Sequence, residues 1–123
     1  MRRIITVLSV SACILIGAGC KMNRAPVTPG APVGPEVGIA GESLHFLVVT
    51  TDPDLDSVRY RVDWGDALGG WTGFLASAES CNVGHAWFVR DTYSIEVLAE
   101  DVHGRQSEWS VGHVVSIESL CRR

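Results

Sequence analysis

The sequence predicts an all-β protein, an antiparallel β-sandwich of about seven strands, and two observations carry this prediction. From Glu36 onward, short runs of residues alternate between apolar and polar side chains, which is the period of a half-buried strand. Turn-forming residues separate these runs, and no helical stretch is recognisable among them. Alternation of this kind is typical of antiparallel sheets that bury one face.

The expected strands lie near Glu36 and at residues 43–50, 58–64, 71–74, 82–87, 92–101 and 111–117. The clearest is 58–64, which reads VRYRVDW and alternates at every position. The runs 71–74 and 82–87 are the weakest. The residues expected to face the core are Leu44, Phe46, Val48, Val58, Tyr60, Val62, Trp64, Tyr93, Ile95, Val97, Ala99, Val111, Val115 and Ile117, with His113 on the same side as the last three.

The first 19 residues resemble a bacterial lipoprotein signal peptide. Arg2 and Arg3 precede an apolar run that ends in IGAGC at Ile16–Cys20. This run is shorter than the ~20 residues of a membrane-spanning helix. The resemblance implies cleavage before Cys20 and attachment of lipid to that cysteine, and an uncleaved signal anchor is the alternative. The expected location is therefore the cell envelope, with the membrane as a partner through this lipid.

Residues 20–35 are expected to form the lipidated cysteine and a proline-rich tether, followed by one domain over residues 36–123. Prolines recur every third residue at positions 26, 29, 32 and 35. This period matches the three residues per turn of a polyproline II helix, and such a tether extends to roughly 45 Å. A disordered spacer would serve equally to hold the domain away from a membrane.

The charge of the domain argues against nucleic acid as a partner. All 14 acidic residues lie between Glu36 and Glu118, a stretch with only four basic residues: Arg59, Arg61, Arg90 and Arg105. Binding to phosphates requires a basic surface instead. On the outer face of the sheet, Arg59 and Arg61 are expected to pair with Glu96 and Glu100.

Cys81 and Cys121 remain as a possible disulfide once Cys13 and Cys20 are set aside. A bridge closing this loop of about 40 residues would stabilise the fold by roughly 4 kcal/mol. The strand count places Cys81 and Cys121 nominally at opposite ends of the sandwich, beyond the reach of a bridge, so the pairing stays open.

Three motifs resemble those of a polycystic kidney disease (PKD) domain. They are DWGD at Asp63–Asp66, GHAW at Gly84–Trp87 and TYSIEVLAEDVHG at Thr92–Gly104. The resemblance implies an immunoglobulin-like sandwich and a non-catalytic surface module, in which Asp63, Trp64, Gly65, Asp66, His85 and Tyr93 form the structural turn motif. Two positions depart from the pattern, since Ala67 and Asp91 stand where the family usually has glycine. Fibronectin type III domains are the alternative resemblance.

Asp63 and Asp66 are interpreted as turn residues rather than a catalytic pair. Strands of alternating direction place their hairpin at the end of the sandwich opposite the tether. A hairpin tip offers no cleft, and aspartates in turns bond to the local backbone. No Ser nucleophile motif is present, and the four histidines lack zinc-ligand spacing. No enzyme activity is expected.

The loops 52–57, 75–81 and 103–110 are expected at the same end as the tether, and there the sequence suggests a calcium site. Asp52, Asp54 and Asp56 alternate in TDPDLDS, and Asp101 is expected to approach from the neighbouring loop. An EF-hand is excluded because its obligatory glycine is absent and strands flank the loop. A polar turn shaped by Pro53 is the alternative to calcium.

The expected function is a lipid-anchored envelope protein that displays one module for protein or glycan binding, or for spacing. A purely structural or assembly lipoprotein is the alternative, and a hydrolase is the least favoured class. Trp71 and Trp109 lie near expected loops, where an exposed tryptophan would contact a sugar or a protein partner. Core packing is the favoured interpretation for both.

Overall fold

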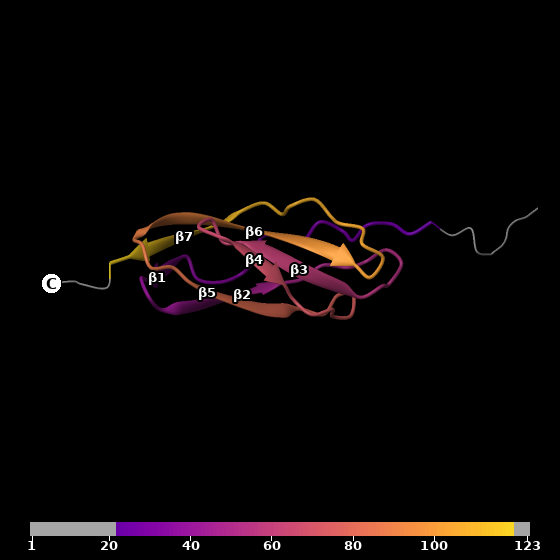
Figure 1. The fold of residues 1–123 in the computed structure, drawn as a ribbon, viewed down its shortest axis with the longest axis horizontal. Coiled ribbons are helices and arrows are strands. Elements are labelled where there is room, and N and C mark those ends of the chain that lie inside the picture. The colour runs from indigo at the N-terminus through magenta and orange to yellow at the C-terminus, as the bar shows by residue number, and fades with distance from the viewer. Residues whose placement is uncertain (1–21, 120–123) are drawn as a thin grey trace, which may run out of the picture.

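The computed structural model describes residues 22–119, which form two β-sheets packed face to face (Figure 1). The strands are β1 (Val37–Ile39), β2 (Ser43–Val48), β3 (Val58–Asp63), β4 (Leu68–Trp71), β5 (Cys81–Ala86), β6 (Asp91–Asp101) and β7 (His113–Glu118). The larger sheet has the order β1-β7-β6-β3-β4, and the smaller sheet pairs β2 with β5. The predicted all-β sandwich of seven strands is confirmed.

Strand direction differs from the prediction at one pair. β3, β6 and β7 are antiparallel neighbours, whereas β1 runs parallel to β7, with Val37 opposite Ser116 and Ile39 opposite Glu118. The turn after β1 contains Gly41 at a φ of 91°, a conformation that favours glycine. This turn passes the chain to the other sheet, so β1 takes an edge beside β7 rather than forming a hairpin with β2.

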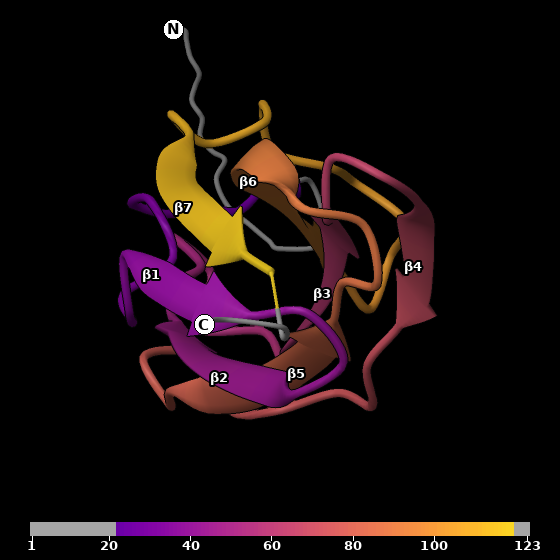
Figure 2. The same ribbon diagram turned by 90° about the vertical axis from the view of Figure 1, so that its left-hand side faces the viewer.

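The core lies between the two sheets, whose arrangement Figure 2 shows in end view. Strand β3 alternates as predicted, with Val58, Tyr60 and Val62 buried and the residues between them half-buried. The full cluster of buried side chains is Phe46, Val48, Val58, Tyr60, Val62, Trp64, Val83, Trp87, Ile95, Val97, Ala99, Val115 and Ile117. The prediction for Val111 is wrong, because it precedes β7 and is 74% exposed.

Strand β4 begins earlier than the predicted run 71–74. The chain reverses immediately after β3, where the Trp64 N–H donates to the Ala67 carbonyl at 2.9 Å. Leu68, the first residue after this turn, therefore pairs with Asp63. Residues 72–75 still contact β3, through Thr72 and an isolated bridge between Val58 and Leu75.

Residues 22–35 lie along the sandwich, which differs from the predicted free tether. The Val27 N–H donates to the Thr51 carbonyl at 2.9 Å, and Val33 forms an antiparallel bridge with Leu47 of β2. Pro32 is fully buried. Prolines cannot donate within a ladder, yet they pack well at a sheet edge, which explains why this segment binds there without becoming a strand. Residues 20 and 21 lie outside the described part of the chain.

Candidate functional site

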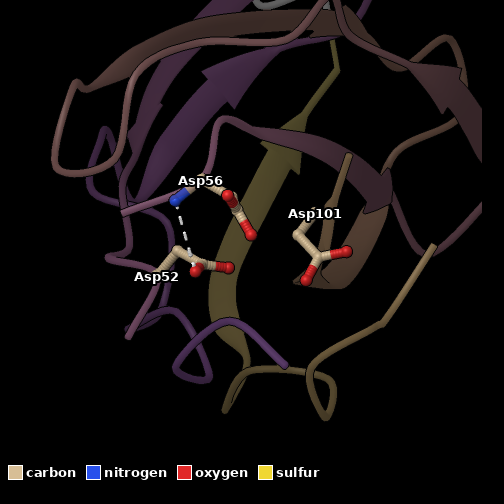
Figure 3. Close-up of side chains that lie close together, drawn as sticks. All are labelled: Asp52, Asp56 and Asp101. Carbon is tan, nitrogen blue, oxygen red and sulfur yellow. Dashed lines mark hydrogen bonds between the residues drawn. The ribbon is translucent and has the colours of Figure 1, made fainter. Parts of the chain in front are cut away.

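The two acidic loops meet at one end of the sandwich, as the strand directions predicted. Asp52 and Asp56 lie in the connection between β2 and β3, and Asp101 ends β6. One carboxylate oxygen from each of the three lies within 4.8 Å of the others. Figure 3 shows the three carboxylates gathered around a common space. We call this group the acidic site.

Asp52 is 2% exposed and supports its own loop with one oxygen. Its Oδ1 accepts hydrogen bonds from the backbone N–H of Asp54 at 2.8 Å and of Asp56 at 3.3 Å. Its other oxygen, Oδ2, is buried and has no hydrogen-bond partner among residues 22–119. Buried polar atoms are nearly always satisfied, so this oxygen distinguishes Asp52 from an ordinary turn residue and makes it a candidate ligand.

Asp101 is 1% exposed and is held by three donors. Its Oδ1 accepts from the backbone N–H of His103 at 2.9 Å and of Arg105 at 3.0 Å, while Oδ2 accepts from Asn23 Nδ2 at 2.7 Å. Burial by itself raises the pKa of Asp101, but these donors outweigh burial and hold the pKa below its ordinary value. Asp101 is therefore ionised near neutral pH.

Asp56 is half-buried and completes the acidic site from the same loop as Asp52. Its Oδ2 lies 3.5 Å from Nε2 of His103, whose side chain is largely exposed. Leu55, the residue before it, has a φ of 61° and is 82% exposed. This left-handed residue turns the loop so that Asp52 and Asp56 lie close together.

Asp54 does not belong to the close group, so three of the four predicted ligands converge. Its Oδ2 accepts the Arg24 N–H at 2.8 Å, and its Oδ1 lies 3.4 Å from the Arg24 guanidinium. The alternation of aspartates in the sequence suggested a single ligand face, but the Asp54 carboxylate contacts Arg24 instead of joining Asp52, Asp56 and Asp101. Asn23 is a site neighbour that the sequence did not indicate, because it lies 78 positions before Asp101 in the segment expected to be a tether.

The donor chemistry of the acidic site fits a hard cation. Three carboxylates offer only oxygen ligands, which calcium and magnesium prefer, and the site holds no sulfur or imidazole ligand in its close group. The unpartnered Oδ2 of Asp52 is the observation that separates this group from an ordinary acidic surface. Asp52, Asp56 and Asp101 are thus the residues that would hold a calcium ion.

The DWGD turn lies at the opposite end and is structural. Oδ1 of Asp63 accepts the Gly65 N–H at 3.0 Å, which is the local backbone bond predicted for this turn. Oδ1 of Asp66 lies 3.0 Å from His85 Nε2. The His85 ring stacks on Trp64 with 4.8 Å between ring centroids and an interplanar angle of 8°. Both carboxylates therefore serve the turn and its packing.

An aromatic cluster fixes this distal end to the core. Trp87 is fully buried, and its Nε1 donates to the Trp64 carbonyl at 3.0 Å. Tyr93 stacks near Trp87 and donates its hydroxyl to the Val89 carbonyl at 2.6 Å. The positions that depart from the motif, Ala67 and Asp91, both have negative φ, so neither requires glycine here.

The outer face of β3 and β4 carries arginines against aromatic rings. Arg59 pairs with Glu100 as predicted, with 2.8 Å between Nε and Oε1, and its guanidinium lies 4.6 Å from the centre of the Trp71 ring. Arg61 differs from the prediction, because it lies opposite Leu98 and donates to the Gly69 carbonyl. Trp71 is half-buried, whereas Trp109 is 40% exposed.

Two of the cysteine predictions fall outside the described residues. Cys20 and Cys121 lie beyond residues 22–119, so neither the lipid attachment nor the Cys81–Cys121 bridge is tested. Cys81 begins β5 and is half-buried, and its burial raises the pKa of the thiol. Between Met22 and Ser119, no helix has the length and apolar character needed to cross a membrane.

The fold and its motifs define an immunoglobulin-like β-sandwich module. No protein-family model and no curated protein matches the chain. Among solved structures, the PKD domain of an M14-like peptidase from Thermoplasmatales archaeon SCGC AB-540-F20 matches with 32% identity and a TM-score of 0.72, covering 78% of this chain and 98% of that one. The chain therefore belongs to the PKD domain family, as its motifs indicated.

Two further structures show likeness at low identity. The CARDB domain of the Pyrococcus furiosus PF1109 protein, solved in complex with di-metal ions, has 15% identity and a TM-score of 0.50, covering 82% of this chain and 100% of that one. The fibronectin type III domain of human fibronectin type III domain containing protein 3 has 16% identity and a TM-score of 0.39, covering 81% and 94%. The likeness to the CARDB domain shows a shared fold alone.

Proposed function

We propose that this protein is a non-catalytic envelope protein, anchored through lipid on Cys20, that displays one PKD module for binding a protein or glycan. The match to a PKD domain, which is itself one part of a peptidase, supports the non-catalytic module, and the likeness of residues 1–20 to a lipoprotein signal supports the anchor. The candidate acid pair Asp63 and Asp66 supports it as well, because both carboxylates are engaged in turn contacts. Trp109, which is 40% exposed, offers an aromatic surface for a partner.

Anchoring through Cys20 would place the acidic site near the membrane. Residue 22 lies at the same end of the sandwich as Asp54 and Asp101. The DWGD turn and the connection between β5 and β6 would then face away from the membrane. A ligand in the envelope would approach this distal end or the two sheet faces.

Lipid attachment is tested by membrane fractionation of the full chain. Cys20→Ala should move the protein from the membrane fraction to the soluble fraction. Cys81→Ala is the matched control, because it also removes a thiol but should stay with the membrane. If Cys20→Ala stays in the membrane fraction, the lipid anchor is wrong.

The second part of the proposal is that the acidic site binds calcium. Its supporting observation is Oδ2 of Asp52, a buried carboxylate oxygen without a partner in the described chain. The test is isothermal titration of the detergent-solubilised full chain with calcium after treatment with a chelator. One calcium ion should bind per chain, with weaker binding of magnesium, which demands a smaller and more regular site. A flat titration with calcium would exclude the site.

A further inference from the structure

Residues 22–27, which we call the strap, cross the acidic site and join it to the start of the described chain. Asn23 donates to Asp101 Oδ2 at 2.7 Å, the Arg24 N–H donates to Asp54 Oδ2 at 2.8 Å, and the Val27 N–H donates to the Thr51 carbonyl at 2.9 Å. Thr50 also donates its hydroxyl to the Val27 carbonyl. The strap therefore touches both loops that supply the acidic site.

A depression of about 360 Å³ lies between the strap and these loops. Its lining comes from both sides: Met22 and Asn23 from the strap, and Asp54, Asp56 and His103 from the loops. Asp56 belongs to the acidic site, and Asn23 contacts Asp101, another of its members. The strap thus forms one wall of the space beside the carboxylates.

The three carboxylates repel one another, and this repulsion opposes closure of the site. Their ligand oxygens lie within 4.8 Å of one another, and Asp52 and Asp101 are almost fully buried, where water screens charge poorly. The ion pair between Arg24 and Asp54 contributes little, because the Arg24 side chain is 66% exposed. A divalent cation would remove the repulsion directly.

We propose that Asn23 completes the cation site, so that calcium binding and docking of the strap are a single coupled event. This inference rests on the calcium site proposed above. Asn23 offers an amide oxygen, a ligand type that calcium accepts, and its amide group already lies against a carboxylate of the site. Asp52 Oδ2, the unpartnered oxygen of the acidic site, supplies an open ligand position beside Asp56 and Asp101. Calcium then holds the strap on the domain, and the docked strap in turn strengthens calcium binding.

Thermodynamic linkage makes the coupling quantitative. If calcium binds the docked form more tightly than the undocked form, the population of undocked strap falls by the ratio of the two affinities. Couplings of this kind are commonly about 5–150-fold. The same factor must appear as weaker calcium binding when Asn23 is removed.

Trypsin provides the test, because the strap contains its own cleavage site after Arg24. The detergent-solubilised full chain is digested with calcium or with a chelator, and fragments are followed by mass spectrometry. Calcium should slow cleavage after Arg24 by about tenfold or more, which is within the usual range of such couplings. Cleavage after Arg90, at the opposite end of the sandwich, is the internal reference and should not change.

Asn23→Ala should abolish most of this protection and weaken calcium binding by the same factor. Asn82→Ala is the matched control, since Asn82 is an exposed asparagine of β5 whose side chain lies against His45, away from the acidic site. It should leave both the protection and the affinity unchanged.

The outcomes separate this inference from the calcium site itself. If no calcium binds, the site and the coupling both fail. If calcium binds but cleavage after Arg24 is unchanged, the site stands and the coupling is wrong. If Asn23→Ala binds calcium with unchanged affinity, Asn23 is not a ligand and the inference is overturned.

Discussion

Asp52 and Asp101 support their loops in the same way, although they lie on different sides of the acidic site. In each, Oδ1 accepts the backbone N–H groups of the residues two and four positions later. In each, Oδ2 remains for the site: it is unpartnered in Asp52 and bonded to Asn23 in Asp101. Because Oδ1 is fixed by the backbone, Oδ2 is held in place before any ligand binds, which lowers the entropy cost of binding.

The first prediction concerns Asp52→Asn in the presence and absence of calcium. The amide keeps an oxygen for the loop N–H groups but removes a charge and a calcium ligand. At calcium equal to 100 times Kd, the unchanged chain should gain about 2.7 kcal/mol in its free energy of unfolding. This corresponds to a rise in Tm of roughly 10 °C or more. Asp52→Asn should lose this gain.

In chelator, the same variant should be as stable as the unchanged chain or more stable, because one of three mutually repelling charges is gone. Thermal unfolding by circular dichroism measures both effects. Asp63→Asn, in the distal turn, is the control and should keep the full calcium response. Equal loss of stability with and without calcium would show that Asp52 serves the loop alone.

The second prediction concerns the acid limb of the stability curve. The folded-state pKa of Asp101 lies below the ordinary value of ~3.9, so its ionised form is favoured by folding. Its stabilising contribution is complete above that ordinary value and is lost as the pH falls through the folded-state pKa. Urea unfolding in chelator between about pH 2 and 7 should show this loss. Asp101→Asn should make the acid limb shallower, and an identical slope would contradict the prediction.

The third prediction concerns the distal turn. Gly65 has a φ of 90°, and an added Cβ would lie 3.2 Å from the Ser94 carbonyl oxygen and 3.2 Å from Tyr93 Cβ. Gly65→Ala should therefore lower the free energy of unfolding by about 1–3 kcal/mol, from backbone strain and crowding together.

Gly70→Ala is the matched control for this turn. A Cβ at Gly70 would meet no atom within 4 Å, and the backbone there has negative φ. Its effect should be within about 0.5 kcal/mol, as for other surface substitutions. Chemical denaturation of both variants measures the difference in free energy of unfolding. Equal stability of the two would contradict the expected strain and crowding at Gly65.

Much of the fold could be predicted from the sequence because the relevant signals are local. Alternation in residues 58–64 and 92–101 located β3 and β6, and strand direction then placed Asp52 and Asp101 at the same end. The motif residues Asp63 and His85 also lie where the PKD resemblance implied.

The parts that could not be predicted depend on contacts between distant residues or on backbone geometry. Asp54 was expected in the site, but its carboxylate contacts Arg24, a residue 30 positions earlier in the chain. The left-handed φ of Leu55 in the same loop also cannot be recognised from sequence, because leucine rarely adopts it. Asn23 was missed because a proline-rich segment gives no sign of which surface it will bind. The same holds for Val33, whose bridge to Leu47 replaces the expected free tether.

The parallel pairing of β1 with β7 has a mechanical consequence. The two described ends of the chain lie at opposite ends of the sandwich (Figure 1). Tension between these ends would pull β1 and β7 in opposite directions along their length, once the contacts of residues 22–33 are released. Their hydrogen bonds would then be loaded together in shear rather than opened one at a time. The β1–β7 pair at the edge of the larger sheet is thus oriented to resist stretching between the two described ends of the chain.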